Sequence, residues 1–135
     1  MHGRALAEAE LRYFDLGDDV SDEEKTARFL FKQVTEGIQY LHTEALVAHR
    51  DIKPDNIFYN GEEDLERVKI GDYTLAVEMP SPDFKVTGRA GSLAFMPPEC
   101  FKEEAYDPRL MDMWALGVSI YIYVTLELPF KGDSE

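Results

Sequence analysis

A stretch dense in polar side chains runs from Ala48 to Asn56 of this 135-residue chain. Five of its positions hold residue types that carry out chemistry in enzymes: His49, Arg50, Asp51, Lys53 and Asn56. A given residue type occurs at a fixed position by chance about one time in 20, so the combined pattern is not accidental. A single aspartate is most often a turn or cap residue. The whole pattern instead indicates a catalytic segment.

This stretch resembles the catalytic loop of protein kinases, where H-R-D is followed by lysine and asparagine at fixed offsets. The resemblance implies that Asp51 accepts the proton of the substrate hydroxyl and that Lys53 contacts the phosphate being transferred. Asn56 would bind a metal ion that bridges the phosphates of ATP. A lysine two residues after the loop aspartate, as at Lys53, resembles the pattern of serine/threonine kinases. The implied activity is transfer of phosphate from ATP to serine or threonine of a protein.

A second metal ligand follows roughly sixteen residues later. The apolar segment 68–70 ends in Gly71-Asp72-Tyr73-Thr74, which resembles the D-F-G segment of kinases. Asp72 would be the principal Mg²⁺ ligand, because Mg²⁺ prefers carboxylate and phosphate oxygens. The expected cofactors are therefore ATP and Mg²⁺. The resemblance also puts Phe58 at the floor of the adenine pocket, above Ser119 and Tyr123, and the residues 57–59 are expected in the core.

Two further segments resemble kinase motifs in the correct order. Residues 91–99 resemble the end of the activation segment, where Ser92 would touch the catalytic aspartate and lysine and Glu99 would be a buried anchor. Residues 112–118 resemble the central buried helix, whose aspartate, Asp112, would hold the backbone of the catalytic loop. His49 would join a hydrophobic column with Tyr73 that is anchored at Asp112.

Regulation by phosphorylation is not favoured by the sequence. Arg50 has two interpretations: it pairs with a carboxylate, or it receives a phosphate on the activation loop through a bidentate contact. Thr87 and Ser81 are the available acceptors, but Gly88 occupies the usual phosphorylated position. Val77 also stands where a second basic contact is expected.

Within the kinases, residues 95–99, 21–41 and 129–133 resemble one group most. It comprises the calcium/calmodulin-dependent kinase kinases and the related kinases that activate AMP-activated kinase. The resemblance implies a protein substrate, which in this group is itself a kinase, and activity that often needs no loop phosphorylation.

The hydrophobic pattern predicts two helices. Ser21 and Glu24 form a capping box that opens a helix of about six turns ending near His42. Its apolar stripe recurs at helical spacing: Ala27, Leu30, Phe31, Val34, Ile38 and Leu41. Residues 112–126 are apolar almost all round, and their length favours a buried helix over a strand. Residues 1–20 begin helically, with a turn at 15–19.

Between these helices, residues 57–59 and 68–70 predict a β-hairpin whose loop carries Asn60-Gly61 and the acidic run 62–66. Residues 75–98 predict a long loop. The expected fold class is α+β, mainly helical, with a short hairpin beside the catalytic loop. We interpret 1–135 as a partial kinase domain, a C-terminal lobe running from about kinase helices D and E to the end of the central buried helix.

Composition excludes several classes of partner. The net charge of −13 argues against nucleic acid and anionic membrane surfaces, which basic side chains bind. The single cysteine, Cys100, permits no internal disulfide and fits a reducing compartment. We expect no signal peptide and no membrane span, and a location in the cytoplasm or the nucleus. The sequence does not indicate an oligomeric state.

Three departures from the kinase pattern predict a chain that is inactive alone. The chain contains no G-x-G-x-x-G loop, no V-A-I-K lysine and no matching helix glutamate, so we expect the N-terminal lobe to be absent. Thr74 replaces the glycine of D-F-G, where a β-branched residue resists the backbone angles that glycine tolerates. Glu99 is expected to lack its arginine partner. The alternative is a kinase-derived binding module that works without catalysis.

Overall fold

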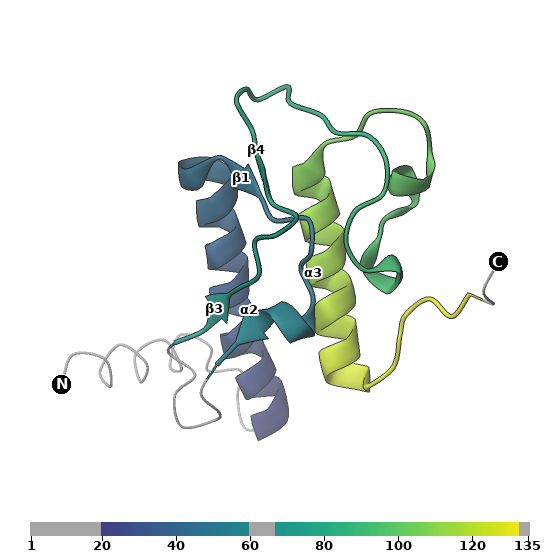
Figure 1. The fold of residues 1–135 in the computed structure, drawn as a ribbon. Coiled ribbons are helices and arrows are strands. Elements are labelled where there is room, and N and C mark those ends of the chain that lie inside the picture. Colours follow the sequence, from purple (N-terminus) through teal and green to yellow (C-terminus); the bar gives the residue numbers. More distant parts are fainter. Residues whose placement is uncertain (1–19, 60–66, 133–135) are drawn as a thin grey trace.

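The computed structural model describes residues 20–59 and 67–132 (Figure 1). The helical start expected before residue 20, the turn at 15–19 and the acidic run 62–66 lie outside the described residues. About half of the described chain is helical, and two small antiparallel sheets complete it. The predicted class, α+β and mainly helical, is confirmed.

The first long helix, α2, spans Asp22–Tyr40. Ser21 caps it, and the Ser21 hydroxyl accepts a hydrogen bond from the Glu24 amide at 3.2 Å, so the predicted N-cap is confirmed, whereas the Glu24 carboxylate pairs with Arg28 instead of closing the capping box. The α-helix ends at Tyr40, close to the predicted end near His42. It widens into a π-helical turn over Leu41–Ala45 and stops at Leu46, which adopts a left-handed conformation with φ 54°.

The second long helix, α3, spans Pro108–Thr125 and begins four residues before the predicted start at Asp112. Asp107 caps it by accepting the Arg109 amide at 2.9 Å, and Pro108 occupies the first turn, where its missing N–H costs nothing. Figure 1 shows α3 running antiparallel to α2. Their facing sides form the main core together with two isoleucines from the segment between the helices: Leu30, Phe31, Val34, Ile38, Ile52, Ile57, Ala115 and Leu116.

Two short ladders position the loops between the helices. β2 (Ile57–Phe58) pairs with β3 (Lys69–Ile70), so the predicted hairpin is confirmed. β1 (Val47–Ala48) pairs with β4 (Val77–Glu78), which lies inside the segment predicted to be loop throughout. The described loops also contain 3₁₀ turns at Pro54–Asn56, Leu93–Phe95 and Pro98–Phe101.

The expectation that the whole of residues 57–59 lies in the core is wrong. Ile57 is buried, but Phe58 is 54% exposed and Tyr59 is 42% exposed. Successive side chains of a strand point to opposite faces, so Phe58 points away from the core that Ile57 enters, while Tyr59 lies beyond the end of β2. The Phe58 ring instead covers Gly71, where an added Cβ would lie 2.6 Å from a ring carbon.

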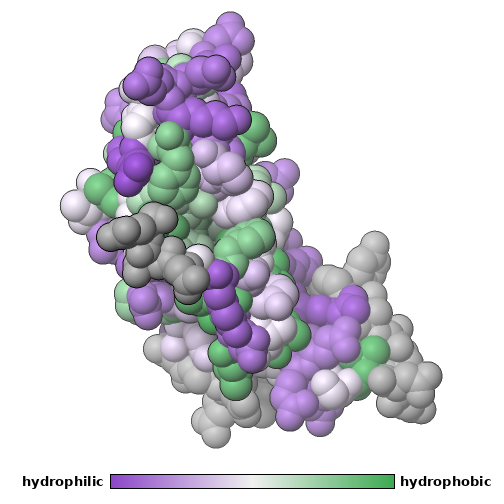
Figure 2. Space-filling view, turned by 90° about the vertical axis from the view of Figure 1, so that its right-hand side faces the viewer, coloured by the Kyte–Doolittle hydropathy of each residue, from purple (hydrophilic) through white to green (hydrophobic). Residues whose placement is uncertain are grey.

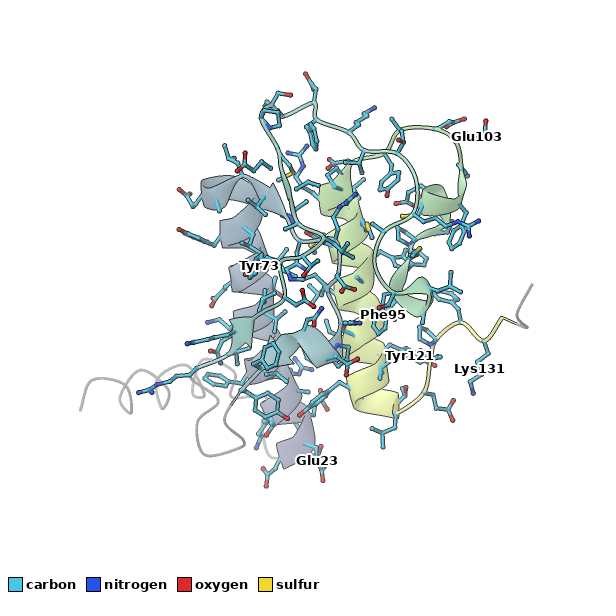
Figure 3. The ribbon with its side chains drawn as sticks, in the orientation of Figure 1. Glu23, Tyr73, Phe95, Glu103, Tyr121 and Lys131 are labelled. Carbon is cyan, nitrogen blue, oxygen red and sulfur yellow. The ribbon has the colours of Figure 1, made fainter. Side chains whose placement is uncertain are left out.

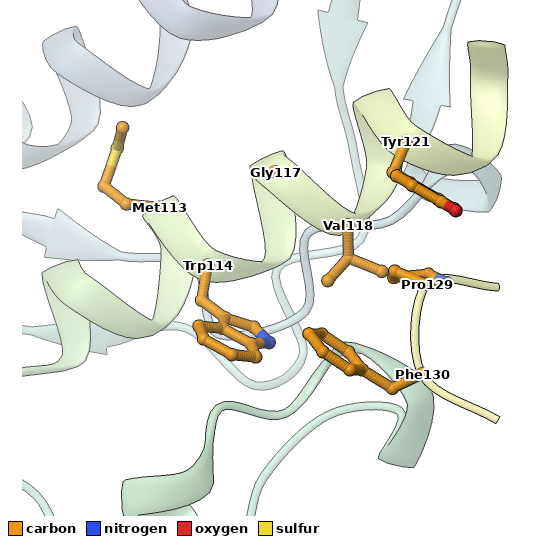
Figure 4. Close-up of a pocket in the computed structure, with 7 residues that line it drawn as sticks. All are labelled: Met113, Trp114, Gly117, Val118, Tyr121, Pro129 and Phe130. Carbon is orange, nitrogen blue, oxygen red and sulfur yellow. The ribbon is translucent and has the colours of Figure 1, made fainter. Parts of the chain in front are cut away.

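Several apolar side chains of α3 are exposed at the surface, as expected for a helix whose sequence is apolar almost all round. Figure 2 shows hydrophobic patches among hydrophilic ones on one face of the molecule. A pocket of about 280 Å³ opens on α3 and the segment after it (Figure 4). Its lining comprises Met113, Trp114, Gly117, Val118, Tyr121, Pro129 and Phe130. Trp114 stacks on Phe130 with ring centroids 5.4 Å apart, and no predicted catalytic residue lines the pocket.

In the described residues, no helix is both long and apolar enough to cross a membrane.

Candidate active site

Asp112 organises the backbone of the candidate catalytic loop. Its side chain is fully buried on α3 and accepts the amide N–H groups of His49 at 2.9 Å and Arg50 at 2.8 Å. His42 Nε2 lies 2.7 Å from the same carboxylate. A buried carboxylate is tolerated only with such donors, because an unpaired one is costly to remove from water. These contacts hold Arg50 in a left-handed conformation, with φ 67°.

His49 is buried and links two segments. Its Nδ1 accepts the Asp51 amide at 3.1 Å, so Nε2 carries the proton that is donated to the Gly71 carbonyl at 2.8 Å. The imidazole also makes an edge-to-face contact with Tyr73, with centroids 4.9 Å apart. Tyr73, labelled in Figure 3, comes from the segment after β3. The structure therefore brings together the three residues of the predicted column, His49, Tyr73 and Asp112.

Asp51, Lys53, Asn56 and Ser92 converge on one polar cluster. The Lys53 ammonium donates to the Ser92 hydroxyl at 2.9 Å, and that hydroxyl lies 3.4 Å from Asp51 Oδ1. The Asn56 amide nitrogen donates to the Asp51 carbonyl at 2.8 Å and to Oδ2 at 3.2 Å. The Asp51 side chain is thus held by groups from two different segments. The Asn56 nitrogen is committed to Asp51, so its amide oxygen is available to a metal ion.

A glycine lets the activation segment approach this closely. Gly91 has φ +80°, a conformation that side chains disfavour. A Cβ built at Gly91 would lie 2.6 Å from the Arg50 carbonyl oxygen and 3.4 Å from Asp51 Oδ1. Any other residue would push Ser92 away from Asp51.

Asp72 lies at the surface beside the catalytic loop. The Gly71 amide donates to the Asn56 carbonyl at 2.9 Å, which fixes the segment that carries Asp72. Asp72 has φ 54°, and its Oδ1 accepts the Thr74 hydroxyl at 2.6 Å and the Thr74 amide at 3.2 Å. The pKa of Asp72 is lowered from its ordinary value of 3.8, mainly by the hydrogen bond from the Thr74 hydroxyl and next by the one from the Thr74 amide. Burial opposes this lowering, and the nearby His49 and Lys53 add to it.

The strain expected at Thr74 is not present. The left-handed residue of this turn is Asp72, and Thr74 is not among the described residues with positive φ. A β-branched side chain is therefore accommodated, because the unusual backbone angle falls two residues earlier.

Hydrogen bonds between protein groups hold the predicted activation segment in place. Arg109 on α3 donates to the Pro82 carbonyl at 2.6 Å, and Val86 and Tyr106 exchange backbone hydrogen bonds at 2.9 and 2.8 Å. The Tyr106 hydroxyl donates to the Gly88 carbonyl at 2.6 Å. Thr87 is exposed and in none of these contacts. Arg50 Nε donates to the Leu75 carbonyl at 2.9 Å, a backbone partner that neither interpretation of Arg50 included.

Glu99 is partly exposed, so the expectation of a buried anchor is wrong for the described residues. Glu99 lies in the 3₁₀ turn Pro98–Phe101, and the buried side chain of that turn is its neighbour Cys100. Cys100 packs with Tyr106 and Met111 in a second small cluster, and burial raises the pKa of its thiol. This favours the unreactive protonated form.

Sequence reasoning missed three contributors to the site. His42 was placed only near the end of a helix, although a histidine before a catalytic loop is a candidate partner for a buried carboxylate. Gly91 belongs to the motif at 91–99, but its steric role depends on the Arg50 carbonyl, which is remote in sequence. The second donor function of Thr74 was also missed, although an aspartate two residues before a threonine is a common turn pattern.

The donor set fits Mg²⁺. Within the described part of the chain, no cluster of three or more histidine, cysteine, aspartate or glutamate residues is placed to hold a metal ion. Mg²⁺ does not need such a cage, since it is commonly bound by one or two carboxylates, several waters and substrate phosphates. The Asp72 carboxylate and the Asn56 amide oxygen match this mode of binding.

A buried aspartate that holds an H-R-D loop, a lysine and asparagine beside the loop aspartate, and a further aspartate on the adjoining turn are features typical of protein kinases. Comparison with known sequences agrees. The family model described as the protein kinase domain matches residues 7–135, so the chain belongs to the protein kinase family.

Curated relatives are serine/threonine kinases. A calcium/calmodulin-dependent protein kinase kinase of Caenorhabditis elegans is 39% identical over 111 residues, covering 80% of this chain and 20% of the relative. The serine/threonine-protein kinase GRIK1 of Arabidopsis thaliana is 35% identical over 122 residues, covering 90% and 30%. Sperm motility kinase 2A of Mus musculus is 40% identical over 112 residues, covering 83% and 21%. The chain thus spans less than a third of the length of these relatives.

Proposed function

We propose that this chain supplies the phosphotransfer half of a serine/threonine protein kinase that uses ATP and Mg²⁺. The observation that carries the proposal is the convergence of Asp51, Lys53, Asn56 and Ser92, in which one aspartate is held by side chains from two segments. Family membership supports phosphoryl transfer, and the roles of the individual residues are part of the proposal.

The chain's own residues divide the work by position. Asp51 Oδ1 accepts a hydrogen bond from a serine or threonine hydroxyl of the substrate and takes up its proton as the oxygen attacks. The Ser92 hydroxyl, 3.4 Å from Oδ1 in this structure, marks the place where such a donor can lie. Lys53 presents a positive charge beside that point, and its contact with Ser92 keeps the ammonium close to Asp51.

Asp72 and Asn56 would hold the metal ion, Asp72 through its carboxylate and Asn56 through its amide oxygen. When bound there, Mg²⁺ would neutralise negative charge on the phosphates of ATP. Lys53 lies close enough to Asp72 for its charge to help keep that carboxylate ionised. Phe58, exposed beside Gly71, would contribute an apolar surface to the adenine ring.

We further propose that the 135-residue chain transfers little phosphate by itself. It contains no G-x-G-x-x-G segment to cover the nucleotide phosphates and no V-A-I-K lysine to bind them. Positioning supplies most of the catalysis in phosphoryl transfer, so a nucleotide that is not clamped reacts slowly.

The test compares the chain alone with a fusion that carries the N-terminal kinase lobe of the Caenorhabditis elegans relative before residue 1. Transfer of labelled phosphate from ATP to a mixture of protein substrates is measured. We expect transfer by the fusion, its loss in the Asp51→Asn fusion, and almost none by the chain alone. Robust Asp51-dependent transfer by the chain alone would overturn the proposed inactivity. A folded fusion that binds MgATP but transfers nothing would favour the binding module.

The substrate of the whole protein is proposed to be another kinase, because one relative is named a kinase kinase. Activity without phosphorylation of Thr87 is proposed because Gly88 occupies the usual phosphorylated position, and because Tyr106 and Arg109 bind this segment through its backbone carbonyls. A cytoplasmic location is proposed from the single reduced cysteine, with the nucleus as the alternative.

A further inference from the structure

The Thr74 hydroxyl donates to the carboxylate that is proposed to bind the metal. It approaches Asp72 Oδ1 at 2.6 Å, which is shorter than the 3.2 Å contact of the Thr74 amide. We propose that Thr74 is a positioning residue that fixes the Asp72 carboxylate so that only Oδ2 faces the metal ion. This inference rests on the proposed metal role of Asp72.

The two donors of Thr74 act on one oxygen. Both the hydroxyl and the amide reach Oδ1, and no other hydrogen bond to the Asp72 carboxylate occurs among the described residues. A hydrogen bond from a neighbouring residue orients a ligating carboxylate and is normally part of a metal site. With Oδ1 occupied, Oδ2 is left as a single ligand atom, which suits the small octahedral Mg²⁺ ion better than a bidentate carboxylate does.

Among the residues that the structure describes, no other group near Asp72 replaces this restraint. Asp72 is exposed, so packing does not select its rotamer. A glycine at position 74 could supply the amide but not the hydroxyl. Thr74 is itself exposed, which means that its side chain can be changed without opening a cavity in the core.

Four variants separate the hydroxyl from the rest of the side chain. Thr74→Val keeps the shape and removes the donor, Thr74→Ser keeps the donor, and Asp72→Asn removes the ligand charge. Thr43→Val is the matched control, because the Thr43 hydroxyl is also exposed and donates to the Gln39 carbonyl at 2.9 Å.

The probe is Mn²⁺ alone, added to the 135-residue chain, with paramagnetic broadening of amide NMR signals as the measurement. We expect broadening at residues 71–74 in the parent chain and its loss in Asp72→Asn. Thr74→Val should need about tenfold more Mn²⁺ for the same broadening, the low end of the effect of such partners. Thr74→Ser and Thr43→Val should match the parent. Three-bond couplings should report one Asp72 χ1 rotamer in the parent and averaging in Thr74→Val.

The outcomes separate the two proposals. No broadening at residues 71–74, or broadening unaffected by Asp72→Asn, overturns the metal role of Asp72 and this inference with it. Broadening that needs Asp72 but is unchanged or strengthened in Thr74→Val overturns the role of Thr74 and leaves the proposed function intact. Should Thr74→Val be poorly folded, the same comparison is made with Thr74→Ala.

Discussion

The imidazole of His42 lies 2.7 Å from the carboxylate of Asp112, although 70 residues separate the two in sequence. The contact joins the π-helical turn after α2 to the buried face of α3. Two backbone amides of the candidate catalytic loop donate hydrogen bonds to the same carboxylate. One side chain therefore connects both helices with the loop that carries Asp51.

Asp112→Asn should destabilise the whole fold. The asparagine side chain has one acceptor oxygen where the carboxylate has two. Its NH₂ group would face a backbone amide of His49 or Arg50, which would then lose its acceptor. We expect a loss of about 3 kcal/mol in the free energy of unfolding, measured by urea denaturation. Asp55→Asn, at an exposed position, is the control and should change stability by less than about 0.5 kcal/mol. Equal effects of the two variants would contradict the role given to Asp112.

Gly91→Ala should be more damaging than Gly88→Ala, although both glycines have φ +80°. The backbone cost of a Cβ at positive φ, about 1 kcal/mol, is common to both variants. Only at Gly91 does the Cβ meet the Arg50 carbonyl, because nothing lies within 4 Å of the one built at Gly88. We expect Gly91→Ala to lose roughly 1–3 kcal/mol more in urea denaturation and to shift the NMR signals of Arg50 and Asp51. Equal losses of stability in the two variants would show that the Gly91 backbone does not lie tightly against the Arg50 carbonyl.

Arg109→Gln should loosen the activation segment. The variant removes the bond to the Pro82 carbonyl and weakens the contact with Asp107. The Val86 amide, bonded to Tyr106, should then exchange its hydrogen roughly fivefold faster, as expected for a loss of ~1 kcal/mol. Lys102→Gln, at an exposed position, should leave this exchange unchanged. An unchanged rate in Arg109→Gln would mean that other contacts hold the segment.

Tyr106 should make stability fall at alkaline pH. Burial, with smaller effects from its neighbours, raises the pKa of Tyr106 from 10 in the unfolded chain to about 12 in the fold. Because the folded pKa is the higher one, the stabilisation is complete below pH 10 and is lost as the pH rises to about 12. Tyr106→Phe removes this term and should flatten the fall in denaturation midpoint over that window. Parallel curves for the two proteins would refute the assignment.

Local signals in the sequence were sufficient for the features that depend on neighbouring residues. Ser21 and Glu24 lie in one helical turn, and the strands at 57–58 and 69–70 are close in sequence, so both were predicted. The start of α3 was missed although Asp107-Pro108 is a recognisable cap. The pairing of Val47–Ala48 with Val77–Glu78 joins two-residue strands thirty residues apart, which no local pattern reveals.

The candidate site was predictable to the extent that its residues belong to a known motif. The motif indicated Asp51, Lys53, Asn56, Ser92 and Asp72, and the structure brings the first four together, with Asp72 on the adjoining turn. The motif did not predict which of the site's side chains are buried and which are exposed. The exposure of Phe58 follows from which face of a short ribbon meets the helices, and that of Glu99 from the orientation of one 3₁₀ turn.

The attachment of the loop to Asp112 has a consequence for its motion. The amides of His49 and Arg50 point into a carboxylate carried by a core helix, so the loop cannot peel away while α3 stays in place. These two hydrogens should exchange with solvent only through cooperative opening of the entire helix pair. The catalytic loop, though irregular in backbone, then belongs to the slowest-opening unit of the molecule, and its shape persists as long as the fold does.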